Sequence, residues 1–186
     1  MNIYSILWLA FAAVWLIAWA RTKRTQERVP LSSRLLYDLP VIVASYLMFT
    51  DDVPLGLGHW FRIPRNPLAT AIALAFTVAG IAFAIWARFY LGQNWSSVVT
   101  IKVDHKLIRT GPYRWVRHPI YSGLLLALFG TALAKGKPIG LIAVLLFFLG
   151  FWIKSRMEER FMLKTFGAEY EDYSRSTGAL IPKLRF

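Results

Sequence analysis

The chain has 186 residues, of which 56% are hydrophobic and only 17% are charged, whereas soluble proteins average about 25% charged residues. This composition argues against a soluble enzyme and indicates a protein embedded in a membrane. The formal charge of +12 would suit a nucleic-acid partner, but the basic residues lie beside apolar runs, so we expect no nucleic-acid partner. The absence of cysteine removes disulfides and thiolate chemistry, and the spacing of the three histidines predicts no metal site.

Five apolar runs follow one another along the chain, and each approaches the length that a membrane-crossing helix needs. They lie near residues 3–20, 35–50, 68–90, 119–134 and 138–154. Asp38 and Pro40 interrupt the start of the second run, and no small-residue cleavage site precedes Arg21, which favours a retained first helix over a signal peptide. The predicted fold class is therefore an all-α integral membrane protein of about five transmembrane helices, with residues 1–186 forming a single membrane domain.

The distribution of basic residues predicts the orientation of these helices. If the first run ends in the cytoplasm, 18 of the 22 basic residues fall on that side, and the other side keeps Arg62, Arg65, Lys135 and Lys137. The positive-inside rule then predicts a multi-pass protein with its N-terminus outside and its C-terminus in the cytoplasm. The excess positive charge would attract anionic membrane lipids. The sequence gives no indication of the oligomeric state.

The fourth and fifth runs are joined by a short turn, Lys135-Gly136-Lys137-Pro138, in which the proline suits the start of a helix. These features predict a tight antiparallel hairpin. The loop that enters the fourth run and the segment that leaves the fifth then lie at the same end, so residues 107–121 and 154–159 become neighbours.

A basic, aromatic loop leads into the fourth run. Pro119 suits a first helical position and disfavours helical geometry at His118, so the helix should begin there with unpaired amides at its mouth. Such a helix end attracts anions, and Arg117 and His118 would strengthen the attraction. Tyr121 follows His118 by three residues and shares its face. Two interpretations stay open, a binding site or ordinary helix-start chemistry with an interfacial tyrosine.

Charged residues crowd the end of the fifth run, at Lys154, Arg156, Glu158 and Glu159. Ionisable groups near membrane depth are costly unless paired, which makes them functional candidates. The alternative is an ion pair between Lys154 and Glu158 on a solvated helix end. Adjacent helical residues point about 100° apart, so we expect at most one glutamate to face a site.

The segment after these glutamates has aromatic residues at helical spacing against charged ones, which predicts an amphipathic helix. It would lie on the membrane interface or cover a site between the helices. Gly167 should break or bend it.

At these residues the chain resembles the isoprenylcysteine carboxyl methyltransferase family, with the phospholipid methyltransferases as wider relatives. The resemblance covers roughly residues 88–182. It rests on the segments Leu91–Ser96, Leu107–Gly123, Glu158–Arg160 and Phe166–Tyr170, and on Pro182. It implies a membrane enzyme that takes S-adenosyl-L-methionine as methyl donor and a lipophilic small molecule or lipidated acceptor from the bilayer.

The resemblance also implies a cytoplasmic cofactor pocket formed by the last helical hairpin, its preceding loop and the C-terminal tail, within residues 91–186, with residues 1–90 on the lipid side. Carried over by motif, the cofactor-binding positions are Thr100, His105, Lys106, Leu107, Ile108, Tyr113, His118, Pro119, Ile120, Tyr121 and Glu158. The catalytic candidates are Lys154, Arg156 and Glu159. Family members that methylate a prenylcysteine carboxylate place an arginine where this chain has Lys154, which gives a point charge without the guanidinium fork.

The favoured function is therefore S-adenosylmethionine-dependent carboxyl O-methylation of an isoprenylcysteine-like substrate. The cofactor's carboxylate suits the helix mouth at His118, its ammonium suits Glu158, and its sulfonium suits an aromatic face. One alternative is a phospholipid N-methyltransferase, which would need a base, for which His118 and Glu159 are the candidates. Others are an NADPH-dependent protein like the sterol reductases, which share similar terminal motifs, and a non-catalytic membrane protein that retains the pocket.

Overall fold

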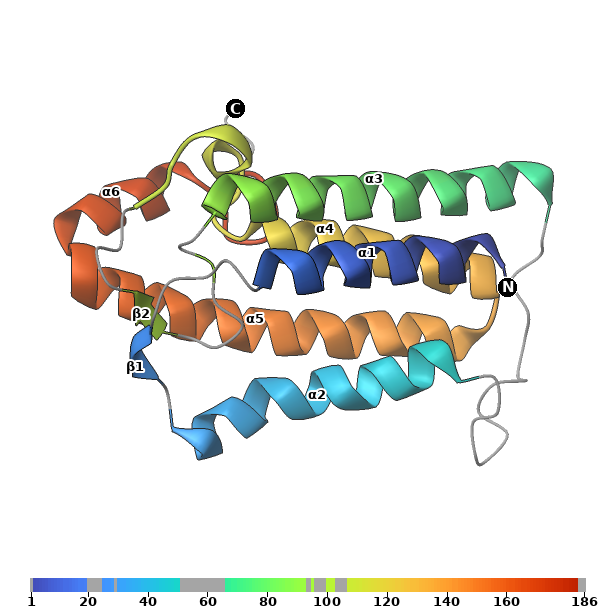
Figure 1. The fold of residues 1–186 in the computed structure, drawn as a ribbon, viewed down its shortest axis with the longest axis horizontal. Coiled ribbons are helices and arrows are strands. Elements are labelled where there is room, and N and C mark those ends of the chain that lie inside the picture. The colour runs from blue at the N-terminus through green and yellow to red at the C-terminus, as the bar shows by residue number, and fades with distance from the viewer. Residues whose placement is uncertain are drawn as a thin grey trace.

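The computed structural model describes residues 2–19, 25–28, 30–50, 66–92, 95, 100–102 and 107–183. Within them, long helices lie side by side in a bundle, as predicted (Figure 1). They are α1 (Ile3–Trp19), α2 (Leu31–Phe49), α3 (Pro67–Leu91), α4 (Pro119–Lys135) and α5 (Pro138–Phe166), followed by the short helix α6 (Ala168–Ser176). A 3₁₀ helix, η3 (Gly111–Arg114), precedes α4.

Each apolar run of the sequence corresponds to one long helix, with two differences in extent. Helix α2 begins at Leu31 and continues through Pro40, so the proline does not delay its start. Helix α5 continues past residue 154 to Phe166, because its charged end is rich in good helix formers. It stops before Gly167, whose φ of 51° lies in the left-handed region, and this confirms the predicted break.

By length and composition, α3 and α5 can cross a membrane, and α1 and α4 are shorter apolar helices. Large apolar side chains are exposed along the bundle, among them Leu16 on α1, Leu39 on α2, Leu68 on α3 and Leu145 on α5. An exposed apolar surface of this extent is unusual for a soluble monomer. It is consistent with a bundle solvated by lipid.

A small β-sheet lies outside the predicted all-α class. Strand β1 (Thr25–Arg28) pairs antiparallel with β2 (Thr100–Lys102), and Thr25 lies opposite Lys102. The two strands belong to the segments that follow α1 and α3. Pairing between these segments satisfies backbone groups that no helix uses, a tertiary contact that periodicity does not reveal.

Glycines bring α3 and α4 into close contact. A Cβ atom at Gly123 would lie 2.7 Å from the backbone nitrogen of Ala84 and 2.7 Å from the carbonyl oxygen of Gly80. Small residues at such crossings are typical of membrane helix pairs. The hairpin of α4 and α5 is present and turns at Gly136, but α4 packs mainly on α3, and α5 mainly on α2.

Candidate active site

Helix α4 begins at Pro119, as predicted, and His118 is the residue at its mouth. The His118 ring stacks on the ring of Tyr121, with centroids 5.7 Å apart and planes inclined by 12°. The three-residue spacing places both rings on one face of the helix. On its other side Tyr121 stacks on Phe151 of α5 at 5.0 Å, so the imidazole is directed toward the end of α5.

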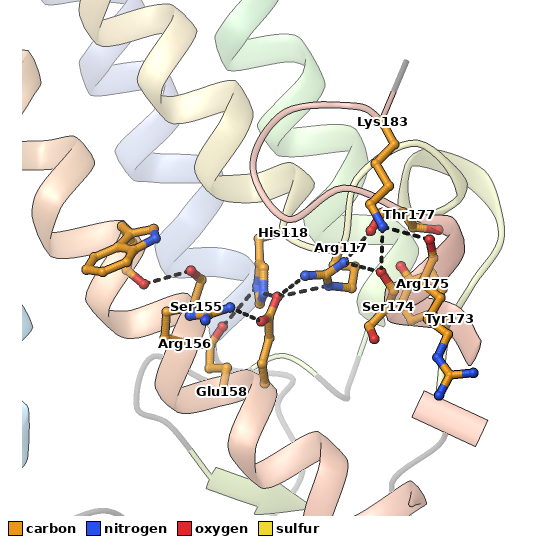
Figure 2. A network of polar contacts seen from close by, with 12 residues as sticks. Arg117, His118, Ser155, Arg156, Glu158, Tyr173, Ser174, Arg175, Thr177 and Lys183 are labelled. Atoms are coloured by element: carbon orange, nitrogen blue, oxygen red, sulfur yellow. Dashed lines mark hydrogen bonds and ion pairs between the residues drawn. The ribbon is translucent and has the colours of Figure 1, made fainter. Parts of the chain in front are cut away.

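Two adjacent glutamates of α5 contact this imidazole, one at each ring nitrogen. Figure 2 shows His118 beside Glu158 and Arg117. Glu158 Oε2 lies 3.3 Å from His118 Nδ1, and Glu159 Oε1 lies 3.3 Å from His118 Nε2. The expectation that at most one glutamate would face the site is therefore wrong. The side chains do leave the helix in different directions, but the imidazole carries a nitrogen on each edge and lies between them.

The surroundings of His118 favour its charged form. Burial by itself would lower the pKa of the imidazole, but hydrogen bonds to Glu158 and Glu159 and the charges of these carboxylates outweigh burial and raise the pKa above its ordinary value. The imidazolium can donate from both nitrogens, one to each carboxylate. In this state it has no lone pair and cannot accept a proton.

Glu158 has a second partner on α4 and a cation nearby. The Tyr121 hydroxyl donates to Glu158 Oε1 at 2.7 Å, and the carboxylate side chain keeps 21% of its surface exposed. Lys154 Nζ lies 5.7 Å from the centroid of the Tyr121 ring and 5.3 Å from that of Tyr37, within cation–π range. With Glu159, the structure thus brings together five of the predicted site residues, at the start of α4 and near the end of α5.

Glu159 is held by Arg117, which the sequence analysis had assigned only to anion attraction. Arg117 Nε and Nη2 donate to Glu159 Oε1 at 2.8 and 2.6 Å. Both side chains are nearly buried. Arg156 Nη1 lies 3.4 Å from Glu159 Oε2, but its side chain is mostly exposed and remains at the edge of the cluster. The position of Arg117 beside His118 was the only sequence signal for this contact.

The C-terminal segment covers the mouth of α4. Arg117 Nη1 donates to the carbonyl of Ser174 at 3.0 Å and to that of Thr177, at the C-terminal end of α6, where a cation is favourable. The His118 backbone N–H donates to Ala179 O at 3.1 Å, and Ser122 Oγ donates to Leu180 O at 2.7 Å. The end of α6 and the residues after it therefore lie against the start of α4, and whether they cover a binding site stays a prediction.

A tyrosine fixes α6 against the loop before α4. The Tyr173 hydroxyl donates to the backbone carbonyl of Tyr113 at 2.6 Å. Burial raises the pKa of Tyr173 to about 12, although Arg117 and Arg109 act in the opposite direction. Its proton is therefore retained, and the hydroxyl remains a donor at neutral pH.

Several predicted cofactor positions lie in an apolar cluster next to the charged one. Tyr113 and Ile120 are buried with Trp95 and Ala87, and Ile108 packs against them. The Tyr113 hydroxyl donates to the carbonyl of Ala87 at 3.3 Å.

The other predicted cofactor positions are more scattered. Pro119 is buried at the start of α4, and Leu107 is half-buried in the loop. Thr100 belongs to the small sheet. His105 and Lys106 lie outside the described residues.

The helical bundle, with its buried polar cluster at one end, has a fold similar to that of a known intramembrane methyltransferase. It is similar to the solved structure of a eukaryotic intramembrane Ras methyltransferase, isoprenylcysteine carboxyl methyltransferase, with a TM-score of 0.60 and 24% identity. The similarity covers 83% of this chain and 54% of that one. The phospholipid methyltransferase family matches residues 68–169, more than half of the chain. The chain belongs to this family.

Curated relatives include two fungal enzymes named protein-S-isoprenylcysteine O-methyltransferase. The Saccharomyces cerevisiae protein is 31% identical over 62% of this chain and 49% of its own length. The Schizosaccharomyces pombe protein is 34% identical over 60% of this chain and 49% of its own length. The match thus spans about half the length of each relative.

Proposed function

We propose that this protein is an integral membrane methyltransferase that transfers a methyl group from S-adenosyl-L-methionine to a lipophilic acceptor, with carboxyl O-methylation of an isoprenylcysteine-like substrate as the favoured reaction. The observation that carries the proposal is the pair of glutamates around the His118 imidazolium, joined to Tyr121 and next to Lys154. Membership of the phospholipid methyltransferase family supports the reaction class, and the names of the relatives support the acceptor class.

The side chains of the site fit S-adenosyl-L-methionine. Glu158 offers a partly exposed carboxylate for an ammonium group. The amino end of α4 favours an anion nearby, although both nitrogens of His118 are already engaged by Glu158 and Glu159. The ring of Tyr113 suits a sulfonium, and Ile108 and Ile120 offer apolar contacts to the remainder. When bound, the cofactor supplies an electrophilic methyl group.

The chain's own residues would align the acceptor and exclude water, which is what an in-line displacement chiefly needs. Lys154 would attract a carboxylate acceptor, which is already a nucleophile and needs no base. The C-terminal segment, held by Arg117 and Tyr173, would close the site from water. In this arrangement Glu159 acts through Arg117 and His118, and it does not contact the reacting atoms.

The same cluster bears on the two alternative enzymes. An amine acceptor must lose a proton, and of the two candidate bases Glu159 is engaged by Arg117, while the contacts of His118 favour its charged form. This occupancy disfavours phospholipid N-methylation. The NADPH alternative is tested by binding, because Arg117, His118 and Lys154 offset the charges of the two glutamates.

We further propose that five helices cross the membrane, with the N-terminus outside and the cofactor site in the cytoplasm, and that residues 1–90 face the lipid acceptor. The apolar lengths of α3 and α5 and the exposed apolar side chains support a multi-pass arrangement. The bias of the basic residues toward one end supports the orientation.

The first experiment is calorimetric titration of the detergent-purified protein with S-adenosylmethionine, with NADPH as the control ligand. We expect saturable binding of S-adenosylmethionine alone, lost in Glu158→Gln and kept in Glu169→Gln, which changes an exposed glutamate of α6. Binding of NADPH alone would overturn the proposal. Equal binding by the wild type and Glu158→Gln would show that this cluster does not hold the cofactor.

A further inference from the structure

A hollow lies beside the loop before α4, and none of the predicted cofactor residues lines it. Its volume is about 500 Å³. Three segments line it, namely the loop with η3, helix α6 and the C-terminal tail. Tyr113 of η3 is buried against α3, whereas its neighbours Arg114 and Trp115 line the hollow. Consecutive residues thus point from this turn toward the apolar cluster and toward the hollow.

The hollow is positively charged. Arg109, Arg114 and Lys183 line it, against a single carboxylate, Asp172. Arg109 is compensated by an ion pair with Glu169. The Lys183 ammonium donates to carbonyl oxygens at the end of α6. The exposed guanidinium of Arg114 has no ion pair among the described residues.

Aromatic side chains place the hollow at the edge of the apolar surface. The Trp115 ring stacks on Phe83 of α3 at 6.3 Å and meets the Trp86 ring edge-on at 5.6 Å. Trp115 is 47% exposed and Trp86 is exposed to a similar degree. Exposed indoles on an apolar helix are typical of the membrane–water interface. Trp115 therefore marks the boundary between the lipid-facing surface of α3 and the basic hollow.

From this juxtaposition we propose that the hollow binds the phosphate of an anionic phospholipid headgroup, with Arg114 and Lys183 around the phosphate and the acyl chains along Trp115 and α3. A guanidinium binds phosphate oxygens with two parallel hydrogen bonds. The neighbouring indoles favour a ligand that continues into lipid over a soluble anion. The site stands on its own observations and does not depend on the proposed methyl transfer.

The test is a titration of the full-length, detergent-purified protein with fluorescently labelled phosphatidylglycerol. The variant is Arg114→Gln. The matched control is Arg175→Gln, which removes the same charge from a highly exposed position on α6 that does not line the hollow. Unlabelled phosphatidylcholine and glycerol 3-phosphate serve as competitors, and melting temperatures establish that both variants are folded.

We expect Arg114→Gln to weaken binding about fivefold, which corresponds to about 1 kcal/mol for one basic residue at a lipid surface, and Arg175→Gln to leave binding unchanged. Added salt should weaken binding in the wild type. Equal effects of the two variants, or equal competition by phosphatidylcholine, would overturn the site. If glycerol 3-phosphate competes as strongly as the lipid does, the hollow binds soluble phosphates, and the proposal of a lipid ligand is wrong.

Discussion

Replacing Glu159 by glutamine should release the C-terminal segment from the bundle. Glu159 Oε1 accepts two hydrogen bonds from Arg117, and the same guanidinium binds the carbonyls of Ser174 and Thr177. Glutamine keeps the size of the side chain but removes the charge that holds Arg117 in place. The His118 imidazolium loses one of its two carboxylate partners at the same time.

The structure sets the expected magnitude. Only 9% of the Arg117 side chain and 12% of the Glu159 side chain are exposed, and removing one partner of a buried ion pair costs about 3–5 kcal/mol. Arg117 keeps its carbonyl partners in the variant, so we expect attachment of the C-terminal segment to weaken by about 2–3 kcal/mol. This corresponds to a roughly 30- to 150-fold larger population of the detached segment. Glu169→Gln is the matched control, because Arg109 and Glu169 are 37% and 55% exposed, and exposed pairs are worth about 0–1 kcal/mol.

Limited trypsin digestion measures this detachment. Cleavage after Arg175 reports the open population as long as reclosing is faster than cleavage. Hydrogen exchange over residues 168–183 gives an independent measure. If Glu159→Gln exposes the segment no more than Glu169→Gln does, the ion pair does not hold the tail.

Three further changes test other parts of the structure. The pKa of His118 is raised in the folded protein, so its charge stabilises the fold fully below the pKa of the unfolded state, about 6.5. This stabilisation is lost as the pH rises through the pKa of the folded state, and the melting temperature should fall over that range. If the melting temperature of His118→Gln falls by the same amount, His118 is not the cause. Gly123→Leu should lower the free energy of unfolding by at least about 1–3 kcal/mol, because the larger side chain overpacks against α3. Its melting temperature should lie below that of the control Leu126→Ala, which changes the partly exposed side of α4. Equal melting temperatures would contradict the close contact between α3 and α4. Lys154→Gln should lower kcat/KM for a prenylcysteine carboxylate about tenfold or more, while Lys154→Arg retains activity; an inactive arginine variant would show that positive charge alone does not explain the role of Lys154.

Local physical chemistry accounts for the features that the sequence predicts correctly. Hydrophobic run lengths predict the long helices, and Pro119 fixes the start of α4 because a proline needs no amide partner there. Gly167 ends α5 because its backbone adopts a positive φ. The short turn at Gly136 makes the two segments of the site neighbours. Each of these features depends on residues close together in the chain.

The features that the sequence analysis missed depend on contacts between distant segments. The pairing of β1 with β2 joins segments that follow α1 and α3, and no periodicity in either segment indicates the other. Likewise, the charge of Arg117 could be anticipated, but its partner Glu159 is 42 positions away. The close packing of α3 on α4 depends on Gly80 and Gly123 together. Neither glycine alone indicates which helix is the neighbour.

The two adjacent glutamates show why an argument from helix geometry alone was insufficient. The angle of about 100° between neighbouring side chains prevents both carboxylates from binding one point, but a protonated imidazole presents donors on two opposite edges. His118 therefore links Glu158, which faces the proposed cofactor position, to Glu159, which holds Arg117 and the C-terminal segment. Because one ring carries the charge for both contacts, a ligand that changes the interaction of His118 with Glu158 also changes its interaction with Glu159. We therefore expect closure of the tail to be coupled, through His118, to occupancy of the proposed cofactor position.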